Sequence, residues 1–157
     1  MREMNWLGRD TLTELIRQAQ AAPRRRRNLN FHASDDASCH RLLNAIEPDS
    51  YIAPHRHLEP DKDETLLVLS GEIGVVAFDE GGVVLSADIL RAGGDRFGVT
   101  IPAGQFHTLI ALAPGSVMFE AKAGPYRPLS ERERAAWAPP EGHENAPQYL
   151  AELRALL

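Results

Sequence analysis

Cysteine and long apolar runs are both scarce in this sequence. The single cysteine, Cys39, excludes an intrachain disulfide framework and a zinc site built from several cysteines. No run reaches the roughly 18 apolar residues that a transmembrane helix needs, so no membrane association is expected. The N-terminal segment MREMNWLGRDTLTELIRQ lacks the apolar core of a secretory signal peptide. We therefore expect a cytoplasmic protein.

Positive charge is also in deficit. The formal net charge is −5, which argues against nucleic acid as a partner, because nucleic-acid-binding domains carry a basic surface. Basic residues are concentrated only in the run Arg24–Arg27, which could attract an anionic ligand or form a solvated arm paired with surface acids. The expected partner is instead a small-molecule ligand.

The chain is long enough for one domain with a substantial core. Its 157 residues contain 43% hydrophobic and 25% charged residues, which is typical of globular proteins. The pattern predicts an N-terminal helix within residues 1–22, a β-barrel over 28–124 and a helical tail over 125–157. Thr11 and Glu14 have the spacing of a capping box for the first helix.

The middle of the chain alternates short apolar runs with glycine- and proline-rich turns, and no long helix interrupts them. Such spacing favours an antiparallel sandwich or barrel. The predicted strands cover residues 39–46, 51–57, 65–70, 73–78, 83–90, 97–101, 106–112 and 117–123. Beyond them, Ser130 and Glu133 have capping-box spacing, and Pro147 suits the first position of a final helix.

Two histidines, His55 and His57, alternate on the predicted strand 51–57. Alternate residues of a strand share a face, so both imidazoles can reach one ion, although two solvated loop histidines would have the same spacing. Glu64 opens the next strand, where it can add a carboxylate if residues 58–63 form the connecting loop. His107 begins a later strand, directly after the turn Pro-Ala-Gly.

The segments PHRH…DETLLVLSGE and IPAGQFHTLIAL resemble the two sequence motifs of the cupins. Six residues separate Glu64 from Gly71, which matches the family spacing. The resemblance implies a jelly-roll barrel that holds one divalent metal ion through four ligands: His55, His57, Glu64 and His107. The loop between His57 and Glu64 is longer than in most cupins, and Asp49 replaces the glycine that usually opens the first motif.

The long loop leaves other carboxylates open as the acidic ligand, namely Glu59, Asp61 and Asp63. Glu64 is preferred because only it precedes Gly71 by the family spacing.

Over nearly its whole length the chain is similar to the WbuC family of cupin-fold metalloproteins. The segments that carry this likeness are NLNFH, CHRLLNAIEP, PHRHLEPDKDETLLVLSGEIGVVAFDE, IPAGQFHTL and FEAKAGPYRP. The likeness implies a bacterial metalloprotein with a cupin fold. Our hypothesis for its function is a small metalloenzyme that acts on a small polar molecule, such as a sugar or sugar derivative of surface-polysaccharide metabolism. The alternative is a non-catalytic module that binds a small ligand or metal. Nitrogen and oxygen ligands of this kind accept Zn, Fe, Mn, Ni or Co. A homodimer is plausible because strand edges must be paired or covered.

Two further side chains are candidate catalytic groups. His32 shares its strand face with Asn30, and histidine titrates near neutral pH, although a hydrogen-bonded surface histidine is the simpler interpretation. Tyr126 could close the barrel mouth with its hydroxyl inward or serve only in packing. Both residues, and Asn30, are candidate substrate contacts.

Three charged residues complete the substrate-binding candidates. Arg41, on a predicted strand, can clamp a carboxylate or phosphate, or form a cross-strand ion pair. Lys62 can reach an anionic substrate from the loop before Glu64, or be solvated. Glu120 lies in an apolar run, where it can orient a ligand histidine or occupy a sheet edge.

Overall fold

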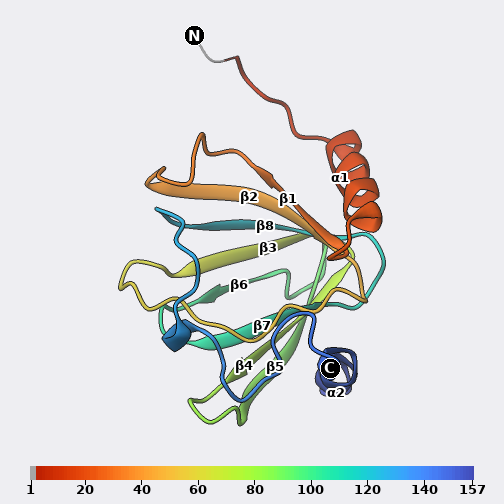
Figure 1. Cartoon of the computed structure of the whole chain (residues 1–157). Helices are drawn as coiled ribbons and strands as arrows, with labels where there is room; N and C mark the ends of the chain where they lie inside the picture. Colours follow the sequence, from red (N-terminus) through yellow and green to blue (C-terminus); the bar gives the residue numbers. More distant parts are fainter. Residues whose placement is uncertain (1–2) are drawn as a thin grey trace.

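A computed structural model describes residues 3–157 (Figure 1). Eight strands lie between two helices, and a single 3-10 turn follows the last strand. The elements in chain order are α1 (Arg9–Ala21), β1 (Arg26–Asn30), β2 (Cys39–Ile46), β3 (Glu64–Ser70), β4 (Glu72–Phe78), β5 (Val84–Arg91), β6 (Gly98–Ile101), β7 (Phe106–Ala111), β8 (Ser116–Ala123), η1 (Glu131–Glu133) and α2 (Ala146–Arg154).

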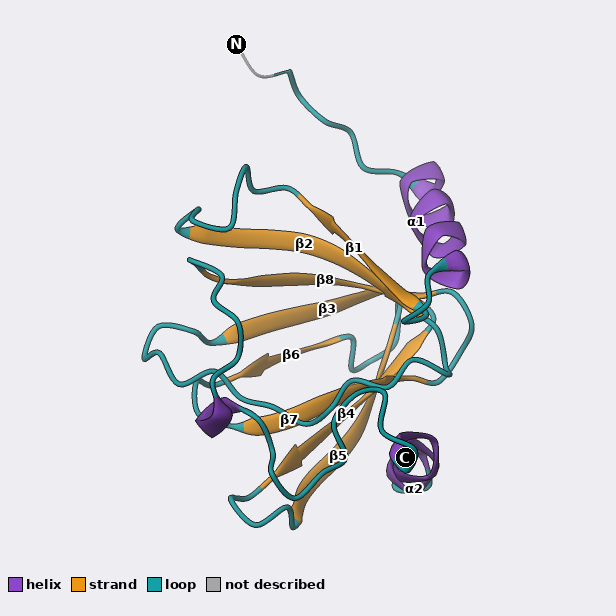
Figure 2. Ribbon diagram, in the orientation of Figure 1, coloured by secondary structure: helices purple, strands orange, loops and turns teal. Residues whose placement is uncertain are grey.

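The strands form two antiparallel sheets that pack face to face as a jelly roll (Figure 2). One sheet has the strand order β1-β2-β8-β3-β6, and the other has the order β5-β4-β7. The predicted antiparallel all-β class is confirmed. Within residues 3–157 the strands hydrogen-bond as two separate sheets, however, and not as one closed barrel. The coil segments that follow β2 and β8 run across the front of the sheets in this view.

The alternation of residues along β2 decides what each face of the larger sheet contacts. Leu43 and Ala45 pack against α1, whereas Ile46 lies in the core between the sheets. Two residues of the helix, Leu15 and Ala19, are buried in this contact. The period of two along the strand thus separates an outer helical layer from an inner space.

The caps of α1 differ from the Thr11–Glu14 capping box. The helix begins at Arg9, and the Gly8 amide donates a hydrogen bond to the Thr11 hydroxyl at 3.2 Å. Glu14 instead forms an ion pair with Arg17 at 2.7 Å, one helical turn further along. The chain therefore enters the helix about one turn earlier than the spacing suggests.

The C-terminal segment covers the outer face of the smaller sheet. Residues of α2, including Leu150 and Leu153, are buried against Phe78 and Ile110. The Ser130 amide and hydroxyl both donate to the Glu133 carboxylate, at 2.9 and 2.7 Å, but the helix there is only the three-residue η1. Among residues 3–157, no helix is both long and apolar enough to cross a membrane.

Candidate metal centre

The predicted ligands come from three parts of the fold. Glu64 is the first residue of β3 and His107 the second residue of β7. His55 and His57 lie on a coil segment, not on the predicted strand 51–57, and only His55 forms an isolated bridge to His107. Pro54 interrupts this segment because proline has no amide hydrogen for a ladder. Two backbone hydrogen bonds still hold His55 against His107, at 3.0 and 2.9 Å.

A left-handed turn before β7 aligns the two histidine segments. Gly104 has φ +86°, a conformation that suits glycine, and its amide donates to the His57 carbonyl at 2.7 Å. The turn Pro-Ala-Gly before His107 therefore ties the start of β7 to the segment that carries His57.

The structure brings the four predicted ligands together. Glu64 Oε1 lies 3.0 Å from His57 Nε2, and Glu64 Oε2 lies 2.9 Å from His107 Nε2. The ring of His55 stands 4.7 Å from the ring of His107, measured between centroids. Glu64 and His107 are only 4% and 2% exposed, so the carboxylate and imidazole meet out of contact with bulk water.

Hydrogen bonds of Nδ1 fix the tautomers of His107 and His55, and the His107 tautomer leaves a lone pair facing Glu64. His107 Nδ1 lies 2.9 Å from the Gln105 carbonyl, and His55 Nδ1 lies 3.0 Å from the Ala53 carbonyl. A carbonyl only accepts, so each Nδ1 carries the hydrogen, and in a neutral ring Nε2 is then an acceptor.

A cation is the natural partner for these atoms. The buried Nε2 atoms of His57 and His107 have no aligned hydrogen-bond partner, although carboxylate oxygens lie beside them. At His107, a lone pair that faces a carboxylate oxygen at 2.9 Å repels it unless a proton or metal ion lies between them. The donor set, imidazole and carboxylate, fits a divalent transition metal.

The donor atoms are nevertheless not preset around one point. Among residues 3–157, no group of three His, Cys, Asp or Glu side chains is arranged to hold an ion as it stands. Glu64 lies directly against two imidazoles, so binding an ion requires side-chain movement there.

Burial and charged neighbours set the pKa values of two predicted ligands, His55 and Glu64. Burial, followed by the nearby His107, lowers the pKa of His55 to about 3, so this ring is neutral at pH 7. Burial alone would raise the pKa of Glu64, but its contacts with His107, His57 and Lys122 outweigh burial and hold that pKa well below its usual value.

Lys122 extends the site across the sheet. Its Nζ lies 3.0 Å from Glu64 Oε1 and 2.8 Å from Glu120 Oε1, since Glu64 and Lys122 are paired neighbours on β3 and β8. Burial works to lower the pKa of Lys122, but Glu120 and Glu64 raise it above its ordinary value. One ammonium group is thus shared by two buried carboxylates.

The loop before β3 keeps its other acids away from the histidines. Glu59 and Asp61 are exposed, and Glu59 pairs with Lys62 at 3.4 Å. Asp63 accepts a hydrogen bond from the Ala103 amide at 2.8 Å. Glu64 is the carboxylate that the structure places against the imidazoles.

The other candidate residues divide between two locations. Glu120 and Tyr126 line the same cavity as the metal-site residues, although Tyr126 is 51% exposed. The remaining candidates do not line it: Asn30, His32, Arg41 and Lys62. The His32 ring stacks on His40 at 3.8 Å between centroids.

Arg41 and Lys62 have separate environments. Arg41 is exposed on the same side of β2 as the residues that meet α1. Lys62 is buried, and its ammonium donates to the Pro125 carbonyl.

The cavity beside the histidines has a volume of about 650 Å³. Sequence reasoning did not assign several of its lining residues to the site. These are chiefly Arg24, Arg26, Arg27, Asn28, Asn44, Lys122 and Arg127. Two features of the sequence could have identified some of these residues. Lys122 alternates with Glu120 on β8, and Asn44 is a polar residue among the apolar residues of β2.

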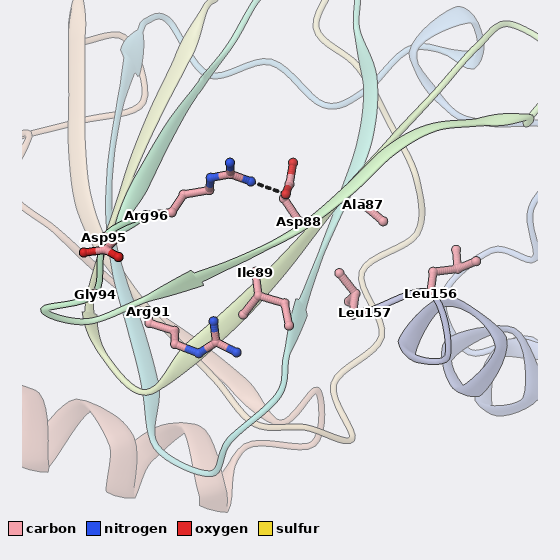
Figure 3. A pocket seen from close by; sticks show the side chains of 9 residues that line it. All are labelled: Ala87, Asp88, Ile89, Arg91, Gly94, Asp95, Arg96, Leu156 and Leu157. Atoms are coloured by element: carbon pink, nitrogen blue, oxygen red, sulfur yellow. Dashed lines mark hydrogen bonds and ion pairs between the residues drawn. The ribbon is translucent and has the colours of Figure 1, made fainter.

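A second hollow of about 700 Å³ lies between β5 and the C-terminus (Figure 3). It contains none of the predicted site residues. Its charged side chains include Arg96, which pairs with Asp88 across the opening. We therefore place the functional site at the histidines, where buried polar atoms lack partners.

Solved structures share this jelly roll. The chain is similar to oxalate oxidase in complex with the substrate analogue glycolate, with 18% identity and a TM-score of 0.53, over 68% of this chain and 55% of that one. A recombinant oxalate oxidase with glycolate gives 18% identity and a TM-score of 0.52 over the same shares. KdgF from Halomonas sp. is 19% identical, with a TM-score of 0.49 over 65% of this chain and 80% of that one. The oxalate oxidase matches show a cupin fold, and the chain spans about half the length of those proteins.

The family follows from the sequence match. Residues 7–90 match the family model described as Domain of unknown function (DUF6016), and the chain belongs to this family. It has no match among curated proteins.

Proposed function

We propose that this chain is a divalent-metal-binding cupin that acts on a small polar molecule. The observation that carries the proposal is the pair of buried imidazole Nε2 atoms that face the Glu64 carboxylate without hydrogen-bond partners. Four side chains would hold the ion: His55, His57, Glu64 and His107. The ion itself would be Zn, Fe, Mn, Ni or Co, since all accept this donor set.

A bound divalent ion would supply Lewis acidity to a carbonyl or hydroxyl oxygen of the ligand. The protein's own groups supply orientation and proton handling. The Gln105 and Ala53 carbonyls fix the rings of His107 and His55, while Lys122 neutralises Glu64 and Glu120. The Lys122 ammonium, 18% exposed and on the cavity wall, can donate a hydrogen bond to a ligand oxygen.

The resemblance to the WbuC family supports a sugar or sugar derivative as the ligand, in a bacterial surface-polysaccharide setting. Turnover of such a ligand would make the protein a metalloenzyme. Binding without turnover would make it the non-catalytic module.

Metal content tests the proposal directly. The untagged full chain is supplied with each candidate ion, desalted and measured by elemental analysis, with about one ion per chain expected. The double variant His55→Ala/His107→Ala should lose the ion. The matched control His32→Ala/His143→Ala removes two histidines outside the cavity and should keep it. A wild-type chain that retains no transition metal after supplementation would overturn the proposal.

A further inference from the structure

The segment that carries His55 and His57 lies between two partners. On one side is β7: His55 exchanges two backbone hydrogen bonds with His107, and the His57 carbonyl accepts a hydrogen bond from the Gly104 amide. On the other side is the chain around η1, which pairs with the segment at His55. In an extended chain, successive amides point to opposite sides, so the amides of the residues before and after His57 point away from β7.

Glu133 of η1 accepts both of these amides. Its carbonyl accepts a hydrogen bond from the Arg56 amide at 2.9 Å, and its carboxylate Oε1 accepts one from the Leu58 amide at 3.0 Å. Its Oε2 accepts the Ser130 amide and hydroxyl, at 2.9 and 2.7 Å. One residue thus ties the backbone on both sides of His57, a predicted metal ligand, to the C-terminal segment.

The carboxylate takes the place of a backbone carbonyl that the 3-10 turn diverts. The antiparallel register set by His55 and Arg134 places Glu131 opposite Leu58. The Glu131 carbonyl instead accepts the Arg134 amide within the turn, at 3.3 Å. The Leu58 amide therefore needs another acceptor, and the Glu133 side chain supplies it.

The Glu133 carboxylate serves these donors and not a cation. Among residues 3–157, no lysine or arginine forms an ion pair with it. Burial would raise the pKa of Glu133, but hydrogen bonds from Ser130 and Leu58 lower it from 4.5 to about 2, so the group is ionised at pH 7. Hydrogen bonds to an ionised carboxylate are stronger than those to a neutral acceptor, which makes it a firm anchor for the backbone.

We propose that Glu133 is a positioning residue of the metal centre, which fixes the backbone before and after His57 and so holds that imidazole against Glu64. The His57 Nε2 atom lies 3.0 Å from Glu64 Oε1. The rings of His55 and His107 are held at their Nδ1 atoms by carbonyl groups, whereas the anchor of His57 lies in its backbone neighbours. The effect on metal binding rests on the proposed function.

Zinc titration of the untagged full chain, in competition with a chromophoric chelator, tests this role. Glu133→Ala removes the carboxylate and should raise the Kd for zinc about tenfold or more, because partners that orient metal ligands typically contribute about 10–100-fold to affinity. Glu133→Gln keeps an oxygen that can accept from Leu58 and should bind zinc more tightly than Glu133→Ala. Glu131→Ala removes an exposed carboxylate from the same turn and should keep the wild-type Kd.

Two measurements separate positioning from a general loss of folding. Each titration is carried out well below the Tm of the metal-free variant, so a role in stability alone would leave the Kd unchanged. In metal-free protein, the Leu58 amide should exchange its hydrogen about fivefold or more faster in Glu133→Ala than in wild type or Glu131→Ala, because it has lost its acceptor.

The outcomes distinguish the role of Glu133 from the metal proposal. If wild type binds zinc and Glu133→Ala binds it with the same Kd, the positioning role is overturned and the metal proposal stands. An equal loss of affinity in Glu131→Ala, or unchanged exchange of the Leu58 amide in Glu133→Ala, would also overturn the positioning role alone. A wild type that takes up no transition metal would overturn the metal proposal and the positioning role together.

Discussion

Lys122 is the group whose removal should disturb the candidate site most. Its ammonium lies 3.0 Å from Glu64 and 2.8 Å from Glu120, and the two carboxylate side chains are only 5% and 10% exposed. Lys122→Met keeps the length of the side chain but leaves two buried carboxylates without their shared cation. Removing one partner of a buried ion pair costs about 3–5 kcal/mol, so the free energy of unfolding should fall by that amount in metal-free protein. At about 2–4 °C per kcal/mol for a domain of this size, the Tm should fall by about 6–20 °C.

Urea unfolding after treatment with a chelator measures this loss. Trp137 packs against Phe78 and Phe106, with ring centroids 4.9 and 5.9 Å away, so its fluorescence reports loss of the core. Glu120→Gln in the Lys122→Met background should restore about 1 kcal/mol or more, because one of the two charges is gone. Added zinc should also restore stability, since the ion replaces the ammonium as a counter-charge to Glu64.

The chain's only other lysine provides the control. Lys62 is also buried, but its partners are the exposed Glu59 and the Pro125 carbonyl, so Lys62→Met leaves no buried carboxylate unpaired. It should therefore lose less stability than Lys122→Met. A metal-free Lys122→Met protein that loses less than about 1 kcal/mol would refute the reasoning, because it would show that the carboxylates do not depend on this ammonium.

Three further predictions concern the motif glycines, acid stability and metal loading. Gly71→Ala should lower the free energy of unfolding in urea more than Gly104→Ala does. At both positions the positive φ should cost alanine about 1–2 kcal/mol. Only at Gly71 would the added Cβ also lie 2.9 Å from Ser116 Cα. Equal losses would contradict that contact. Burial would raise the pKa of Glu141, but its two arginine partners lower it from 4.5 to about 2, so its contribution is complete above pH 4.5 and lost as the pH falls toward 2. Glu141→Gln should therefore flatten the dependence of unfolding free energy on pH in that window, and an unchanged slope would exclude this source. Zinc should raise the Tm of the wild type but raise that of Glu64→Gln much less, and equal shifts in differential scanning fluorimetry would remove Glu64 from the ligands.

The strand pattern was predictable because the relevant forces act locally. Period-two apolar runs bounded by glycine and proline turns identified most strands, and the predicted strand 39–46 coincides with β2, Cys39–Ile46. The segment 51–57 was wrong as a strand because Pro54 interrupts it, and its hydrogen bonds go to His107 and to the C-terminal segment. That pairing depends on residues more than 50 positions away along the chain.

The sequence alone was enough to predict a metal-ligand set made of four residues, namely His55, His57, Glu64 and His107. The spacing of the ligands and the positions of the turn glycines depend on residues that are close together in the sequence, so they can be recognised without the tertiary structure.

The environment of the site could not be drawn from the sequence. Lys122 meets Glu64 because β8 pairs with β3, and Asn28 and Asn44 line one cavity because β1 pairs with β2 in register. His32, which its alternation with Asn30 made a candidate catalytic group, lies outside the cavity lining and stacks on His40. The sequence by itself determined the strands, the turns and the residue types available for metal chemistry. Only the tertiary structure decided which charges share a cavity, because strand order and the facing of the two sheets bring together residues that no local spacing relates.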